Sequence, residues 1–323
     1  MPTMNPTVSV IIPTFNRAPL LTRTVQSVLA QTWKNYELIV IDDGSVDNTR
    51  EILKPYRDRL LYYYQQNRGI SAAQNKGIEF AKGEWISILA SDDEWFPAKL
   101  ERQLQAIGEL GGDFDACFTD CKFMGDPSLR QTAFELGGLE KGRPIGILDR
   151  PLHYVLARHP VVWVQSLLVR RSLMNELGGF DEAMTVAEDT DLLFRLALKT
   201  RFCFVAEALV KIDRTPSRST GLTELFYEGH DKAFSSQEYM CKKWLSLPGM
   251  VDPATRGQVR ELLRNLYYDW TIRKLYQFRF SEAFGKMRQV RQAGDSSPQI
   301  LSTLAFRAAR RLSRSLTPQS HPA

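Results

Sequence analysis

Cysteine is scarce in this chain, which has only four Cys in 323 residues. Their positions do not form a cluster with the spacing of a metal site, although Cys117 and Cys121 share one face if their segment is a strand. We therefore expect buried, reduced thiols of the kind found in cytosolic proteins, and not a disulfide-stabilised secreted domain. Histidine is equally rare, and we expect surface or structural roles for His153, His159, His230 and His321.

Long apolar segments are also absent. A membrane-spanning helix needs about 20 consecutive apolar residues, and the best candidate, Val161–Val169, is short and includes Gln165. The first residues, Met1–Thr7, have neither the basic start nor the apolar stretch of a signal peptide. We expect a cytoplasmic protein that does not cross a membrane.

Glycine-rich phosphate-binding motifs are missing as well. No G-x-G-x-x-G follows the first apolar segment, and no G-x-x-x-x-G-K occurs in the chain. This argues against dinucleotide binding of the Rossmann type and against P-loop chemistry. A nucleotidyltransferase would need a Gly-rich N-terminal loop bearing Arg or Lys, which is not present. In the basic stretch at Gln299–Leu316 no aromatic residue is interleaved with the arginines, so we expect no nucleic-acid partner.

What is present first is a regular alternation of strand and helix signals. Short, nearly continuous apolar runs separated by helical spacing predict an α/β fold, with a mostly parallel sheet that helices cover on both faces. The expected strands are Val8–Ile12, Glu37–Ile41, Leu60–Tyr64 and Trp85–Leu89. The expected helices are Leu20–Gln31, Asn48–Tyr56, Ser71–Ala81 and Pro97–Leu110.

The middle of the chain is less regular, and the end is helical. Gly125–Asp149 is rich in glycine and turn residues and predicts a long surface excursion. Further strands are expected at Ala116–Cys121, Val161–Val169, Phe202–Val205 and Leu209–Ile212, with a helix at Glu188–Lys199. Beyond about Leu222 only helices are expected, at Thr223–Leu245, Pro253–Phe278, Ser281–Ala293 and Gln299–Leu316. We therefore divide the chain into residues 1–222 and an α-helical C-terminal extension, residues 223–323.

Polar clusters follow three of the expected strands. They are Pro13–Arg17, Asp42–Ser45 and Ser91–Asp93. Ligands of open parallel sheets bind beyond the carboxyl ends of the strands. Each cluster alone is also compatible with a turn or a helix cap, but three at one edge favour a binding site. Adjacent carboxylates suit a hard divalent cation that shares its oxygen ligands with a diphosphate.

Four segments carry a resemblance to a known family. "VSVIIPTFNR", "ELIVIDDGSVDNT", "NRGISAAQNKGIEFAKGEWISILASDDEW" and "GGFDEAMTVAEDTDLLFRL" resemble the successive motifs of family 2 glycosyltransferases, in order, across residues 7–219. The resemblance implies a GT-A fold with a Rossmann-like sheet. It also implies inverting transfer of a sugar from a nucleotide diphosphate donor, UDP-linked in many members, to a hydroxyl acceptor.

The resemblance also implies roles for individual residues. Asp189 is the catalytic base, and we expect it to keep a low pKa at a helix N-terminus. Asp93 and Asp92 hold Mn²⁺ or Mg²⁺. Donor-nucleotide binding falls to Pro13, Thr14, Asn16, Asp42, Asp43, Arg68 and Asp92. Trp163 and Glu188 are candidates for the acceptor side, and Trp95 and Trp85 are further aromatic rings for sugar stacking, although Trp85 also fits the core. Asp191 and Arg195 are expected to form a surface ion pair.

Two positions depart from the family pattern. Many members have a further Asp where this chain has Ala90, and many have a His after the last strand, where this chain reads "KIDRTPSRST". Either Asp213 replaces the His as a metal ligand, or Arg214 and Arg218 hold the diphosphate. These departures keep an alternative open, in which the chain is a weakly active scaffold subunit that binds sugar nucleotides and partners another transferase.

The basic charge of the chain is concentrated in its tail. Residues 251–323 contain thirteen Lys and Arg against five Asp and Glu, a net charge of +8, within a total of +5. The helix expected at Gln299–Leu316 either lies at an anionic membrane surface or packs on its own protein. Its apolar side has Leu301, Leu304, Phe306 and Leu312, and its arginines are Arg307, Arg310, Arg311 and Arg314. The membrane interpretation favours a glycan or lipid-linked glycan acceptor at the inner face of a bacterial plasma membrane.

Overall fold

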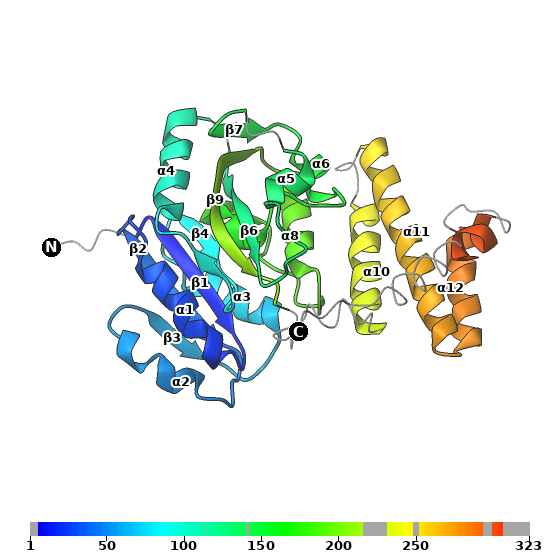
Figure 1. Cartoon of the computed structure of the whole chain (residues 1–323), viewed down its shortest axis with the longest axis horizontal. Coiled ribbons are helices and arrows are strands. Elements are labelled where there is room, and N and C mark those ends of the chain that lie inside the picture. The colour runs from blue at the N-terminus through cyan, green and yellow to red at the C-terminus, as the bar shows by residue number, and fades with distance from the viewer. Residues whose placement is uncertain are drawn as a thin grey trace. The chain divides into compact units, whose positions relative to one another are not determined.

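The computed structural model describes residues 6–112, 114–139, 142–215, 231–247, 252–292 and 299–305. The chain forms two compact units, residues 1–220 and residues 221–323 (Figure 1). The first contains the sheet, and the described part of the second is helical.

The first half of the sheet is parallel, as the alternation of strand and helix signals predicts. Its strands lie in the order β3-β2-β1-β4, and each pairs in parallel with its neighbour. They are β1 (Val8–Thr14), β2 (Tyr36–Asp42), β3 (Leu61–Tyr64) and β4 (Trp85–Ile88). The intervening helices are α1 (Ala18–Leu29), α2 (Thr49–Ile52) with a short 3₁₀ turn at Lys54–Tyr56, and α3 (Ile70–Phe80).

Beyond β4 the sheet becomes mixed. The strands are β5 (Glu94–Trp95), β6 (Ala116–Met124), β7 (Ile145–Leu148), β8 (Leu168–Arg170) and β9 (Phe202–Asp213). Strand β8 runs antiparallel between β4 and β6, whereas β6 and β9 are parallel. Strands β5 and β7 are antiparallel to β9. The α/β class is thus confirmed, with the parallel arrangement limited to β3-β2-β1-β4 and the β6-β9 pair.

Three details of the middle region differ from expectation. Gly125–Asp149 is not only a surface excursion, because it contains α5 (Ala133–Gly137) and β7, and Phe134 is fully buried. In place of a strand over Val161–Val169, a 3₁₀ turn at Val164–Ser166 precedes the three residues of β8. The two short strands expected near residues 202–212 are one strand, β9, which pairs with β6 along its length.

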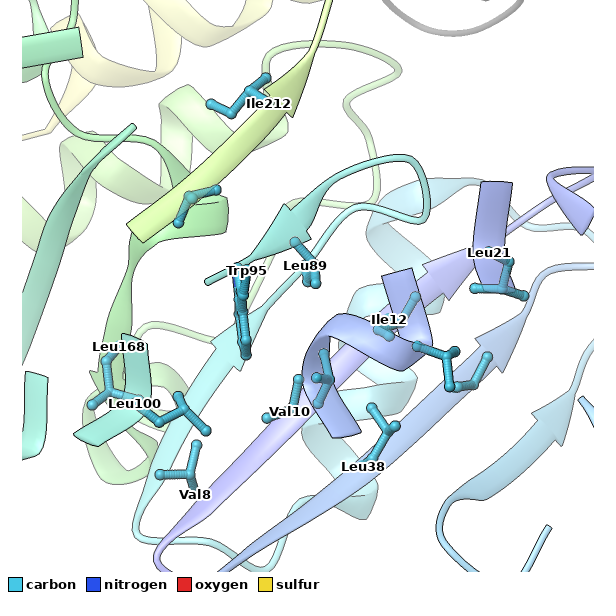
Figure 2. Packing of buried hydrophobic residues seen from close by; sticks show 14 of the residues in the cluster. Val8, Val10, Ile12, Leu21, Leu38, Leu89, Trp95, Leu100, Leu168 and Ile212 are labelled. Carbon is cyan, nitrogen blue, oxygen red and sulfur yellow. The ribbon is translucent and has the colours of Figure 1, made fainter. Parts of the chain in front are cut away.

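The core lies on both faces of the sheet because the strands are apolar on both. Val8, Val10 and Ile12 of β1 belong to a buried cluster with Leu21 of α1 (Figure 2). On the opposite face α3 packs so closely that a Cβ added at Gly77 would lie 2.3 Å from Cγ2 of Ile11. Because β1 is buried on both faces, the polar residues at and after its end, such as Asn16, can reach solvent only beyond the carboxyl edge of the sheet.

The remaining helices of the first unit hold its C-terminal motifs in place. They are α4 (Lys99–Leu110), α6 (Pro151–Val155), α7 (Arg171–Glu176) and α8 (Glu188–Ala197). Asp191 and Arg195 of α8 do not form the expected surface pair, because Asp191 is fully buried. The Arg195 guanidinium bonds Asp191 at 2.8 Å and also donates to the carbonyl oxygens of Leu177 and Gly179. The pair therefore anchors the Gly178–Glu182 turn to α8.

All four cysteines are free and buried. Cys117 of β6 lies beside Cys203 of β9, with the two sulfur atoms 3.0 Å apart. Burial raises the pKa of the Cys117 thiol well above its usual range, so this thiol stays protonated and unreactive.

The second unit contains α10 (Asp231–Ser246), α11 (Pro253–Tyr276) and α12 (Phe280–Gln292), and residues 299–305 are also helical. None of its described helices, nor any in the first unit, combines the length and apolar character needed to span a membrane. Of the apolar residues expected on the last helix, Leu304 is buried and Leu301 is exposed. Phe306, Leu312 and the four arginines lie outside the described residues, as do the beginning of the helix expected at Thr223 and two of the histidines, His230 and His321.

Candidate active site

The carboxyl ends of β1, β2 and β4 lie side by side, because these strands are parallel neighbours. Thr14 at the end of β1 pairs with Asp42 at the end of β2. Ile11 of β1 pairs with Ile88, the last residue of β4. The three polar clusters that follow these strands therefore meet at one edge of the sheet, as the sequence predicts.

The segments after β1 and β2 are bonded to each other. Asn16 donates its backbone N–H to Oγ of Ser45 at 2.9 Å, and its side-chain oxygen accepts from the Val46 N–H at 2.9 Å. Asn16 has a φ of 50°, in the left-handed region that asparagine tolerates better than most residues. Thr14 is buried, and its hydroxyl has no hydrogen-bond partner among the described residues. The segments after β1 and β2 therefore form one rim held by hydrogen bonds, and the buried Thr14 hydroxyl is available to bond a ligand.

Asp42 is held by two donors at the end of β2. One carboxylate oxygen accepts from the Ser45 N–H at 2.8 Å, and the other accepts from the Tyr62 hydroxyl at 2.6 Å. Burial and the hydrogen bond to Asp42 raise the pKa of Tyr62, so its hydroxyl remains a donor. Asp42 is only 1% exposed, and each of its oxygens keeps one further lone pair for a ligand.

Asp43 bonds the loop after β3 rather than facing outward. It accepts from the Gln65 side chain at 2.8 Å, from the Arg68 N–H at 2.9 Å and from the Gly69 N–H at 2.9 Å. Gly44 completes the contact, since its φ is +87° and a Cβ there would lie 2.8 Å from the backbone nitrogen of Asn67. Asp43 therefore positions the beginning of α3 against the end of β2.

We expect Asp43→Asn to lower the free energy of unfolding by about 2 kcal/mol. Asparagine has an NH₂ group in place of one carboxylate oxygen, so at least one of the N–H donors that now bond Asp43 would face another donor. Urea unfolding measures this loss. Asp58→Asn is the matched control, because Asp58 is exposed and has no hydrogen-bond or ion-pair partner among the described residues. Equal unfolding midpoints for the two variants would contradict the role of Asp43.

Arg68 and the Gly178–Glu182 turn meet at the beginning of α3. The Arg68 guanidinium lies 3.1 Å from the Glu182 carboxylate, and 61% of its side chain is exposed. Asn75 of α3 donates to the Phe180 carbonyl at 2.9 Å and to Glu182 at 3.1 Å. These bonds connect α3 to the segment that leads into α8, so the loop after β3 and the beginning of α8 have a common support.

Asp92 and Asp93 follow β4 and differ in exposure. Asp93 is 3% exposed, and its carboxylate accepts the Asp213 N–H at 2.8 Å. Burial, and then the neighbouring charge of Asp92, raise the pKa of Asp93 well above its usual range. The side chain of Asp92 is 32% exposed and lies 4.0 Å from the Arg17 guanidinium. Neither residue caps α4, whose N-cap position is Ala98 without a side-chain bond.

Asp213 at the end of β9 is committed to protein partners. One oxygen accepts from Arg23 at 2.5 Å and the other accepts the Thr215 N–H at 2.8 Å. Burial alone would raise its pKa, but these hydrogen bonds and the charge of Arg23 outweigh burial and lower the pKa to about 2. The same Arg23 guanidinium donates to the Asp92 carbonyl at 2.6 Å and lies 3.6 Å from Glu94. Arg23 therefore joins the end of β9 to the segment after β4.

Arg214 follows Asp213 and lies over an aromatic ring. Its guanidinium carbon is 5.0 Å from the centre of the half-buried Trp163 ring, and Trp163 also contacts Phe123 edge to face. Arg218 lies outside the described residues. The other two candidate tryptophans do not reach the site: Trp95 and Trp85 are each 3% exposed and belong to the core.

Glu188 and Asp189 are adjacent acids at the beginning of α8, the first buried and the second half-buried. Thr190 donates its N–H to Asp189 at 2.6 Å and its hydroxyl at 3.2 Å. Glu188 is 7% exposed. Burial and then the charge of Asp189 raise the pKa of Glu188 to about 8. Burial also raises the pKa of Asp189, although hydrogen bonds from Thr190 and the charge of Arg214 oppose it. The expected low pKa of Asp189 is thus wrong, because desolvation outweighs the helix N-terminus.

The charge of Arg214 acts on two acids from different parts of the fold. It lowers the pKa of Asp93 and the pKa of Asp189, in each case against the effect of burial. Asp93 follows β4 and Asp189 belongs to α8, so Arg214 lies close to both. The structure therefore brings the proposed base and the strand-end acids into one site.

The chemistry of the acids after β4 fits a divalent cation, although no group of three or more His, Cys, Asp or Glu within the described residues forms a complete metal cluster. Asp93 is a buried carboxyl whose pKa is raised by the adjacent charge of Asp92, a combination that a bound cation would relieve. Asp213 fits less well as a ligand, because its negative charge is already paired with the Arg23 guanidinium.

Sequence reasoning missed Tyr62, Arg17 and Arg23. Tyr62 shares a strand with two other tyrosines and nothing in the pattern distinguishes it. Arg17 is the last residue of the motif VSVIIPTFNR, and its place directly after Asn16 could have indicated a residue of the site. Arg23 lies on the exposed-looking side of a helix, and its partner Asp213 is 190 residues away. Only the folded sheet shows that Arg23 and Asp213 meet.

Comparison with known sequences assigns a family. The family model described as Glycosyl transferase family 2 matches residues 9–178. An uncharacterised glycosyltransferase of Rickettsia typhi is 31% identical over 248 residues, covering 75% of this chain and 76% of that protein. The GalNAc(5)-diNAcBac-PP-undecaprenol beta-1,3-glucosyltransferase of Campylobacter jejuni is 31% identical over 186 residues, covering 56% of this chain and 59% of that protein.

Two solved structures have a similar fold. A fragment of S. aureus TarS in complex with UDP-GlcNAc superposes with a TM-score of 0.62 and 20% identity, covering 80% of this chain and 71% of that chain. The mannosyltransferase PcManGT of Pyrobaculum calidifontis, in complex with GDP-Man and Mn²⁺, superposes with a TM-score of 0.57 and 19% identity, covering 96% of this chain and 82% of that chain. The GT-A fold is thereby confirmed. Together with the family model and the relatives, it shows that this chain is a glycosyltransferase that belongs to glycosyl transferase family 2.

Proposed function

We propose that this chain is an inverting, metal-dependent glycosyltransferase that moves a sugar from a UDP-linked donor to a hydroxyl group of a glycan or lipid-linked glycan. The observation that carries the proposal is the hydrogen bond from the Asp213 N–H to Asp93 at 2.8 Å, which sets the next residue, Arg214, beside the acids after β4; the charge of Arg214 also lowers the pKa of Asp189 against the effect of burial. A cation-binding acid, a diphosphate-binding arginine and a base then belong to one site.

The donor nucleotide occupies the rim formed by the segments after β1 and β2. Asp42 has lone pairs left for the N–H of a base, and Thr14 has an unused buried hydroxyl. Pro13 and Asn16 line the same rim, Arg68 extends from the loop after β3, and Asp43 supports that loop. Asp92, the more exposed acid after β4, is placed for the ribose or a cation.

Asp93 and Asp92 would hold a divalent cation, which supplies positive charge to the departing diphosphate when it is bound. Arg214, with Arg218, assists by binding the same phosphates, which is the favoured explanation for the absence of a His after β9. Asp213 orients Arg23 and is not required as a ligand. Ala90 removes one acid of the family pattern, and the arginines offset weaker cation binding by adding positive charge at the diphosphate.

Asp189 removes the proton from the acceptor hydroxyl. Inversion requires that the base and the leaving group lie on opposite sides of the sugar carbon. Thr190 and Arg214 stabilise the ionised form of Asp189, whereas Glu188 has a pKa of about 8 and remains protonated at neutral pH. Trp163, held by Arg214 and Phe123, offers a ring face to an acceptor sugar.

The setting of the reaction is proposed from the relatives. The Campylobacter jejuni relative is named for a reaction on an undecaprenol-linked glycan, which supports a role in bacterial cell-surface polysaccharide or lipid-linked glycan assembly. Residues 1–222 perform catalysis, and residues 223–323 form the extension, at the inner face of the plasma membrane. The alternative, a weakly active scaffold subunit, predicts donor binding without turnover.

Calorimetric titration with UDP and GDP sugars, with and without Mn²⁺, tests the proposal. We expect a UDP sugar to bind more tightly with Mn²⁺, and Asp93→Asn to weaken that metal-dependent binding at least about tenfold, because it removes one ligand charge. Asp58→Asn is the control for the change in charge. If Asp93→Asn binds like the wild type, the metal assignment is wrong. Binding of the UDP sugar without transfer or hydrolysis would favour the scaffold.

A further inference from the structure

Helix α11 ends in a motif that normally needs glycine. The Phe278 N–H donates to the Leu275 carbonyl at 3.0 Å, and the Arg279 N–H donates to the Lys274 carbonyl at 2.9 Å. This pair of bonds defines a Schellman motif, in which the residue after the C-cap Gln277 is left-handed. That residue is Phe278, with a φ of 57°.

Folding gives no reason for a phenylalanine at this position. Glycine or asparagine adopts the left-handed conformation with less strain, because a bulky side chain crowds the backbone there. The Phe278 side chain recovers nothing by burial, since the residue is 80% exposed. The strained backbone at this position therefore carries an exposed aromatic ring, which indicates a role outside folding.

Three more aromatic residues beside Phe278 are exposed. Tyr276 is 47% exposed, Phe280 53% and Phe284 66%. The Phe278 and Phe280 rings lie 6.3 Å apart. We call Tyr276, Phe278, Phe280 and Phe284 the aromatic turn. Four exposed aromatics within nine residues exceed the scattered apolar exposure of an ordinary surface and mark a contact site.

Unpaired positive charge continues from the aromatic turn along α12. Arg288 and Arg291 follow Phe284 by four and seven residues, so they share its side of the helix. Both are exposed, and neither has an ion-pair partner among the described residues. Arg279 differs, because Asp231 and Glu282 bond it. The surrounding segment, residues 251–323, has a net charge of +8.

We propose that the aromatic turn docks on an anionic lipid bilayer. Aromatic side chains favour the boundary between head groups and acyl chains, and arginine pairs with lipid phosphates. A second copy of the chain is a poorer occupant, because the same surface would bring Arg288 and Arg291 against their like-charged equivalents.

This surface is independent of the proposed donor and acceptor, because membrane docking is measured without either. It is also distinct from the helix expected at Gln299–Leu316, since every residue of the aromatic turn precedes residue 285. Variants in the turn leave the sequence of that segment unchanged in the full chain.

Sedimentation of the full-length protein with vesicles of phosphatidylcholine, with and without phosphatidylglycerol, tests the proposal. We expect the wild type to prefer the anionic vesicles, and Phe278→Asn with Phe284→Ser to weaken that binding about tenfold, because two interfacial rings are lost. Leu262→Ser is the matched control, since Leu262 is an exposed apolar residue of α11 outside the turn. Thermal unfolding should show that Phe278→Asn alone is at least as stable as the wild type, because asparagine fits the left-handed position.

Arg288→Gln with Arg291→Gln should reduce both the affinity for anionic vesicles and its dependence on salt. The proposal is overturned if the turn variants sediment like the wild type, or if the wild type does not distinguish the two kinds of vesicle. It is also overturned if the turn variants lose self-association in sedimentation velocity without losing vesicle binding, because the surface would then join two copies of the chain.

Discussion

Asp189→Asn is expected to reduce sugar transfer by about 10²- to 10⁴-fold, the usual contribution of a positioned general base. The amide oxygen can still accept the Thr190 N–H, so the beginning of α8 keeps its geometry. An amide cannot take the proton of the acceptor hydroxyl, however, so the hydroxyl remains a weak nucleophile toward the anomeric carbon of the donor sugar. Donor affinity should stay within about twofold of the wild type, because a base facing the acceptor adds little to donor binding.

Single-turnover transfer and calorimetric donor binding should be measured on the same preparations of Asp189→Asn. Glu176→Gln is the control for the change in charge, since Glu176 is an exposed acid that pairs only with Lys199 in the described structure. Loss of transfer together with loss of donor binding would show a structural role for Asp189. Retained transfer would place the base elsewhere, with the adjacent Glu188 as the first alternative.

Glu188→Gln is expected to change how stability depends on pH. The unfolded-state pKa of a glutamate is near 4.5, and in the folded protein the pKa of Glu188 is about 8. Between these values the folded state holds a proton that the unfolded state releases, so wild-type stability falls as pH rises through this window. The accumulated loss at pH 7 is on the order of 3 kcal/mol. Glutamine, a neutral group of the same shape, removes it.

Urea unfolding at pH 5, 6, 7 and 8 should therefore show that Glu188→Gln is progressively more stable than the wild type as pH rises. Glu176→Gln should follow the wild-type pH dependence, because Glu176 is exposed. Parallel curves for wild type and Glu188→Gln would show that Glu188 is ionised in the folded protein. Because the neutral form is the one proposed to act at pH 7, Glu188→Gln should also retain most of the transfer activity at that pH.

The parallel half of the sheet was predictable because its signal is local. Runs such as Val8–Ile12 and Glu37–Ile41 are apolar at all but one position each, which is typical of strands buried on both faces. Their parallel direction follows from the helices between them, whereas their order is given by the structure. The polar residues at their ends could then be placed at one edge, and Asn16, Asp42 and Asp93 do meet there in the structure.

The second half was less predictable because its pairing is not local. The three residues of β8 are a strand only because β4 and β6 lie on either side of them. The burial of Asp191 could not be read from its spacing to Arg195, since an i,i+4 pair looks the same on a surface and in a core. The pKa of Asp189 depends on the burial of α8, which no motif encodes.

The bond between Arg23 and Asp213 determines when, during synthesis of the chain, the site can form. Asp213 stands 190 residues after Arg23, and the Asp213 N–H is also the donor to Asp93. A nascent chain can pair β1, β2, β3 and β4 as soon as they have left the ribosome, since their contacts are comparatively short-range. Asp93 then lacks the Asp213 N–H, and Arg23 lacks its acid partner, until β9 has been synthesised. We therefore expect translation products that end before β9 to have an incomplete site.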